Sequence, residues 1–148
     1  MLTTSLADPT VVRAAVASGY RPAFADVDER GHLTAAAVRA HLALRGAPAI
    51  IVASHHAGHA CDTTDLAESG ALVVEDAIDA LGAVAADGKP IGSPRHATMT
   101  IVGIHPIRSG APAQGAVMLT DDVTIAARVR RLRDERVEQR LSELHAAL

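Results

Sequence analysis

Residues 49–76, AIIVASHHAGHACDTTDLAESGALVVED, decide the fold of this 148-residue chain. Two continuous apolar runs of strand length, residues 49–54 and 71–75, flank a polar loop over 55–62 and a short helical segment. Such apolar runs are typical of parallel strands that are buried on both faces. The stretch therefore predicts a strand, helix and strand unit of an α/β protein.

Upstream of this stretch, capping residues mark two helices. Asp8 can cap a helix that begins at Pro9 and stops at Gly19, since glycine suits the left-handed residue that ends a helix. Thr34 can cap a second helix over residues 35–45.

The other segments alternate between strand and helix patterns. Strands are predicted at 23–27, 98–104 and 116–119, and helices at 77–86 and, long and amphipathic, at 121–148. We therefore expect an α/β, three-layer αβα architecture with a mostly parallel sheet, and one domain over the whole chain.

Composition excludes several classes of function. Apolar residues make up 49% of the chain and aromatic residues 1%, which leaves no platform on which nucleic-acid bases could stack. The net charge of −3 gives no field that would attract a nucleic acid or an anionic membrane. Cys61 is the single cysteine, so it cannot form an internal disulfide, and neither a leader pattern nor a membrane-length apolar run is present. We expect a cytoplasmic protein.

Polar residues follow the predicted strands, where ligands of open α/β sheets gather. They are Ser54-His55-His56, Glu75-Asp76 and His105-Pro106-Ile107-Arg108.

These positions belong to four stretches that resemble the DegT/DnrJ/EryC1/StrS aminotransferase family. Residues 74–82, Val-Glu-Asp-Ala-Ile-Asp-Ala-Leu-Gly, are similar to its Glu-Asp-Ala-x-x-Ala-x-Gly signature, and residues 20–28 to its Gly-x-x-Pro-x-Phe-x-Asp-x-Asp strand. Residues 55–62 resemble its His-x-x-Gly-x-x-x-Asp loop, and 105–122 the stretch that carries its cofactor lysine. The resemblance implies the middle of the large domain of a type I pyridoxal-phosphate-dependent sugar aminotransferase.

The resemblance also implies roles for particular residues. Asp76 stands where the family pairs a carboxylate with the pyridine nitrogen of the cofactor, and Asp79 and His55 stand at further cofactor-contacting positions. Arg108 stands at the position of the lysine that holds the cofactor covalently, and a guanidinium cannot form that bond. The one lysine of the chain, Lys89, falls in a segment that the family uses as a surface hairpin.

Other parts of the family pattern are absent or changed. The upstream phosphate-binding turn and the small C-terminal domain have no counterpart, and the Gly-Glu-Gly-Gly turn is reduced to residues 113–116. We therefore expect a truncated relative with little transaminase activity alone, which binds pyridoxal 5′-phosphate non-covalently and weakly if it binds it. Expected partners are a second copy, in a homodimer, or a complementary aminotransferase fragment, and not nucleic acid or membrane.

Alternatives remain open at three places. The cluster of His55, His56, His59, Cys61 and Asp62 offers zinc ligands, but its spacing matches no standard site and we expect no metal. His105 is a weak candidate for an acid or base, because some sugar dehydratases of this family carry histidine in place of the lysine. The arginines of the last helix alternate with acids, which favours a solvated face.

Overall fold

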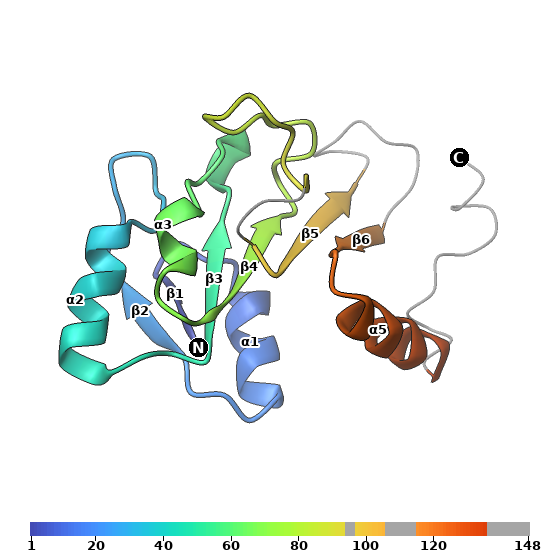
Figure 1. Ribbon diagram of the computed structural model, residues 1–148, viewed down its shortest axis with the longest axis horizontal. Helices are drawn as coiled ribbons and strands as arrows, with labels where there is room; N and C mark the ends of the chain where they lie inside the picture. The colour runs from blue at the N-terminus through green and yellow to red at the C-terminus, as the bar shows by residue number, and fades with distance from the viewer. Residues whose placement is uncertain (94–96, 106–114, 136–148) are drawn as a thin grey trace.

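The computed structural model describes residues 1–93, 97–105 and 115–135. Within these ranges, six strands form one sheet in the order β2-β1-β3-β4-β5-β6 (Figure 1). Neighbouring strands are parallel except β5 and β6, which are antiparallel. The strands are β1 (Leu2–Thr4), β2 (Ala23–Ala25), β3 (Ile50–Ser54), β4 (Leu72–Ala77), β5 (Met99–Ile104) and β6 (Gly115–Leu119). The mixed, mostly parallel α/β sheet confirms the predicted fold class.

The helices lie on both faces of the sheet. They are α1 (Pro9–Ala17), α2 (Ala35–Arg45), the 3-10 turn η1 (His56–Gly58), α3 (Thr64–Ala67) and α5 (Val123–Glu135). On one face, Leu66 of α3 packs with Val73 of β4. On the other, Ala15 of α1 shares a groove with Val74, the next residue of β4. Since successive strand residues point to opposite faces, α1 and α3 lie on opposite sides of the sheet.

The predicted helix caps are confirmed. Asp8 Oδ1 accepts a hydrogen bond of 2.7 Å from the backbone N–H of Thr10, and Thr34 Oγ1 accepts one of 3.1 Å from that of Ala37. Gly19, after the end of α1, has a φ of 81°, which glycine adopts without steric cost.

The helix predicted over residues 77–86 is wrong. Strand β4 runs on through Ala77, and the chain then makes single turns before a hairpin in which Val84 bridges Pro90. Gly82 takes a φ of 84°, which a right-handed helix does not allow. Residues 77–86 were predicted helical from their alanines, but this turn chemistry outweighs helix propensity.

One strand and two element boundaries also differ from the sequence prediction. Strand β1 was not predicted because three residues give no periodicity to recognise. Strand β2 stops at Ala25, and Val27 forms an isolated bridge to Leu33 instead. Helix α5 confirms the predicted last helix as far as Glu135 but begins at Val123, two residues later than predicted, and residues 136–148 lie outside the described part of the chain.

Across the described ranges, none of the helices has the length and apolarity that crossing a membrane requires.

Candidate functional site

Two consecutive carboxylates of β4 point to opposite faces of the sheet. Glu75 is 1% exposed and shares its face with the buried Val73 and Ala77. Asp76 is half-buried and points the other way, where it lines the groove beside α1. Because side chains alternate between the two faces of a strand, Glu75 points into the core and Asp76 points into the groove.

The groove is largely apolar and has a volume of about 790 Å³. Its floor is formed by β3, β4 and β5, including Val52, Val74 and Ile101, and one wall by α1. The polar side chains along it include Asp8, Asp76 and His105. An apolar cleft with a few converging polar groups is the usual form of a small-molecule site.

Asp76 is held in place by three hydrogen bonds. The hydroxyl of Ser54 donates to its Oδ2 at 3.3 Å, and the backbone N–H of Ile78 donates to its Oδ1 at 3.3 Å. Its backbone carbonyl accepts a bond of 2.9 Å from the N–H of His55. The carboxylate is therefore oriented by β3 as well as by its own strand.

The electrostatic surroundings of Asp76 disfavour its charge. Burial raises the pKa of this carboxyl above its ordinary value, and the negative charges of Asp79 and Asp8 raise it further. The bonds from Ile78 and Ser54 oppose this shift without cancelling it. A cation beside Asp76 would stabilise its charged form, which burial and the neighbouring acids make unfavourable.

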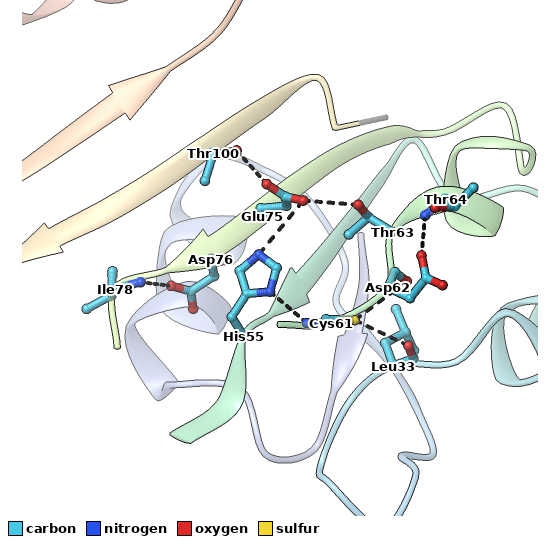
Figure 2. Close-up of polar contacts among 10 residues, drawn as sticks. All are labelled: Leu33, His55, Cys61, Asp62, Thr63, Thr64, Glu75, Asp76, Ile78 and Thr100. Carbon is cyan, nitrogen blue, oxygen red and sulfur yellow. Dashed lines mark hydrogen bonds and ion pairs between the residues drawn. The ribbon is translucent and has the colours of Figure 1, made fainter. Parts of the chain in front are cut away.

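The side chains of Thr100, Thr63 and His55 contact the carboxylate of Glu75 (Figure 2). Thr100 Oγ1 donates to its Oε2 at 2.6 Å and Thr63 Oγ1 donates to its Oε1 at 3.0 Å. His55 Nε2 lies 3.8 Å from Oε1, which is longer than a direct hydrogen bond. Burial acts to raise the pKa of Glu75, but His55 and the two threonines outweigh it and bring this pKa to about 2. Glu75 is thus a buried anion at neutral pH.

The loop after β3 is organised by hydrogen bonds of His55, Cys61 and Asp62. The Nδ1 atom of His55 accepts a hydrogen bond of 2.8 Å from the backbone N–H of Cys61. Burial raises the pKa of the Cys61 thiol to about 12, and this thiol faces the carbonyl of Leu33 at 3.5 Å. Asp62 Oδ1 accepts a hydrogen bond of 3.0 Å from the backbone N–H of Thr64, the first residue of α3. In the described ranges, histidine, cysteine and acidic side chains form no group of three that could hold a metal ion.

The predicted site residues are partly brought together. Asp76 and His105 line the same groove, and Asp79 is near enough to Asp76 to raise its pKa. His55 lies on the core side, with its side chain beside Glu75. Arg108 lies outside the described residues. Lys89 belongs to the hairpin, where its exposed Nζ lies 4.0 Å from Asp87 Oδ2.

The sequence profile of the DegT/DnrJ/EryC1/StrS aminotransferase family matches residues 1–146. The chain belongs to this family. Among curated proteins, it is 31% identical over 137 residues to the UDP-4-amino-4-deoxy-L-arabinose–oxoglutarate aminotransferase of Shewanella sediminis. That match covers 90% of this chain and 34% of the Shewanella protein.

Solved structures of the family share the fold. One is DesI, crystallised in the presence of its TDP-sugar product, with a TM-score of 0.77 and 30% identity over 90% of this chain and 34% of DesI. Another is the aminotransferase TlmJ of Streptoalloteichus hindustanus, with a TM-score of 0.76 and 26% identity over 88% of this chain and 36% of TlmJ. The chain therefore spans about a third of the length of these relatives.

The family implies pyridoxal phosphate, and the residues present fit the pyridine-ring side of that cofactor. Asp76 is an oriented carboxylate in an apolar groove, and burial raises its pKa, so a cationic partner would stabilise its charged form. A protonated pyridine nitrogen is such a cation.

Sequence reasoning missed the buried network around Glu75. Thr63 and Thr100 come from α3's N-cap and from β5, so their approach to Glu75 depends on the tertiary fold. The burial of Glu75 could have been predicted, because Glu75 lies two residues after Val73 in β4 and therefore points to the same face of the sheet.

We predict that Glu75→Gln destabilises the protein in a pH-dependent way. Because the folded-state pKa of about 2 lies below the ordinary 4.5, the contribution of Glu75 is complete above pH 4.5 and fades as the pH falls towards 2. The loss of unfolding free energy should be on the order of 2 kcal/mol at pH 7 and smaller at pH 3. Urea unfolding measures both, with the exposed Glu68→Gln as control. An equal loss at both pH values would contradict the assignment.

We predict that Asp76→Asn stabilises the isolated chain at pH 7. The folded-state pKa of Asp76 is raised, so the wild type loses stability as the pH rises through that pKa, and the amide variant does not. Thermal unfolding should show that the variant has an unfolding free energy about 1 kcal/mol higher than the wild type at pH 7, and that this difference is smaller at acid pH. Such a gain in stability is common when a binding residue is removed. A variant that is less stable than the wild type at pH 7 would show that Asp76 already has a cationic partner.

Proposed function

We propose that this chain is the pyridine-ring-binding part of a pyridoxal-phosphate-dependent sugar aminotransferase, with little or no transaminase activity alone. The observation that carries the proposal is the carboxylate of Asp76, oriented by Ser54 and Ile78 at the edge of an apolar groove. Of the relatives named above, the Shewanella protein is an aminotransferase of a UDP-amino sugar, and DesI was solved with its TDP-sugar product. A nucleotide sugar is therefore the substrate class that we assign to the complete enzyme.

Asp76 would hold the ring by pairing with its protonated nitrogen. When bound, pyridoxal phosphate supplies an electron sink for the carbon that loses a proton. The groove would exclude water from the ring, which strengthens the pairing between Asp76 and the nitrogen. His105, at the end of β5, lines the same groove and is the candidate for moving a proton there.

The covalent side of the site is the part that we infer to be defective. Arg108 occupies the position that matches the family's lysine, and its guanidinium stays protonated. Lys89 offers the one side-chain amine of the chain, but it lies on the hairpin after β4 and pairs with Asp87. This geometry supports non-covalent and weak cofactor binding.

We predict that borohydride treatment of the protein with pyridoxal phosphate yields no stoichiometric covalent adduct. Mass spectrometry of the intact protein measures this directly. The Arg108→Lys variant should gain an adduct at residue 108, while Arg45→Lys, at the end of α2, serves as the matched control for an added amine. A one-to-one adduct in the wild type would overturn the proposed defect.

A second candidate function is assembly with a complementary aminotransferase fragment. It is favoured by the sheet face that carries the groove, since α1 walls only part of it, whereas parallel sheets are normally covered on both faces. The chain spans about a third of its relatives' length, so the remaining part of the fold is the occupant to which we commit. A homodimer through the same face is the competing arrangement.

We predict that the remaining two thirds of the Shewanella sediminis relative, expressed without the region that matches this chain, forms a one-to-one complex with it. Ala14→Arg places a charge on α1 in the groove and should abolish the complex, whereas Ala40→Arg, exposed on α2, should not. Light scattering distinguishes the outcomes. A homodimer that Ala14→Arg dissociates, or no complex with the fragment, would reject this candidate.

A further inference from the structure

His55 contacts two consecutive residues of β4, one on each face of the sheet. Its backbone N–H donates to the carbonyl of Asp76 at 2.9 Å, and its side chain lies beside the carboxylate of Glu75, with Nε2 3.8 Å from Oε1. His55 directly follows β3, so it joins the ends of two neighbouring strands (Figure 2). The position of Asp76 is thus coupled to a histidine that does not line the groove.

The contacts of His55 distinguish its two ring nitrogens. Because Nδ1 accepts a hydrogen bond from the N–H of Cys61, the proton of the neutral ring resides on Nε2, which faces Glu75. A second proton on Nδ1 would break the bond to Cys61 inside the core. Buried Nε2 has no hydrogen-bond partner among the described atoms, so the charge of Glu75 is the interaction that orients it.

We propose that His55, as the neutral Nε2-protonated tautomer, is a positioning residue that fixes Asp76 at the edge of the groove through Glu75 and the β4 backbone. This inference rests on the proposed function only in making Asp76 the ring-binding carboxylate. Three contacts act in sequence. The backbone N–H of Cys61 orients the ring of His55, and this ring, together with Thr63 and Thr100, holds the side chain of Glu75 in the core. Because neighbouring strand residues point to opposite faces, Asp76 then points into the groove.

Several titratable groups surround this assembly and define its controls. His32 interacts electrostatically with His55, His59 and Asp28, and Asp28 and Asp62 act on Cys61. Asp8 and Asp79 act on Asp76 from the groove side. The effect of His55 on Asp76 must therefore be distinguished from the effect of a change in the charge of the loop. For this reason His55 is replaced by uncharged residues only.

Three substitutions separate the two ends of the imidazole. In His55→Gln the amide nitrogen can replace Nε2 as a donor to Glu75, whereas in His55→Asn the amide oxygen can replace Nδ1 as the acceptor for Cys61. His55→Phe keeps the ring and removes both functions. Leu66→Ala, in the same core and without a polar group, is the control for a loss of stability alone.

Two readouts report on Asp76 without any enzyme activity. The N–H of Ile78 bonds directly to Asp76 Oδ1, so its hydrogen exchange follows the position of this carboxylate. Carbon-13 NMR titration gives the pKa of Asp76. In the Asn and Phe variants we expect exchange at Ile78 to accelerate by about tenfold and the pKa of Asp76 to fall towards its ordinary value, because the released carboxylate reaches water. In the Gln variant, the exchange rate of Ile78 and the pKa of Asp76 should stay close to their wild-type values.

The outcomes are decisive even if one variant does not fold. Nitrogen-15 NMR of the wild type must show His55 protonated at Nε2 alone, and a proton on Nδ1 would overturn the proposal. The proposal would also be overturned if the Asn and Phe variants left the hydrogen exchange of Ile78 and the pKa of Asp76 unchanged. The same holds if Leu66→Ala, at an equal loss of stability, changed both quantities as much as the His55 variants do. If pyridoxal phosphate does not bind the wild type, the proposed function fails while these readouts still test the role of His55.

Discussion

The alternation of side chains along β4 is the constraint on which the rest of the site depends. Glu75 and Asp76 are adjacent in sequence, yet the pleat of the strand sends one into the core and the other into the groove. A shift of one residue in the register of β4 would exchange the two, burying the carboxylate meant for a ligand. The pairing of Ser54 with Asp76 between β3 and β4 holds this register.

The two carboxylates show opposite electrostatic solutions to burial. Glu75 is buried more deeply, but hydrogen bonds from Thr63 and Thr100 satisfy it and keep its pKa low. Asp76 is less buried and less well satisfied, and nearby acids raise its pKa. The hydrogen-bonded Glu75 thus contributes to stability, whereas Asp76 is the carboxylate to which the proposed function assigns a ligand.

Much of the fold could be predicted from the sequence, since it depends on local signals. Asp8 and Thr34 capped their helices as expected, and the two apolar runs became β3 and β4. The segment after Asp76 was mispredicted because helix propensity could not anticipate its hairpin. Motif resemblance singled out Asp76 and His55, but the contact of His55 with Glu75 joins residues of two strands and could not be predicted before the sheet was known.

The cofactor chemistry of this family separates into a ring side and an amine side, and the residues of this chain treat them differently. The ring side needs an oriented carboxylate in a dry groove, which the edge of β4 supplies with short-range bonds from Ser54 and Ile78. Under the proposed function, the amine side would need a lysine where the sequence has Arg108. Because the bonds that orient Asp76 come from Ser54 and Ile78, the geometry of this carboxylate does not depend on an amine at residue 108.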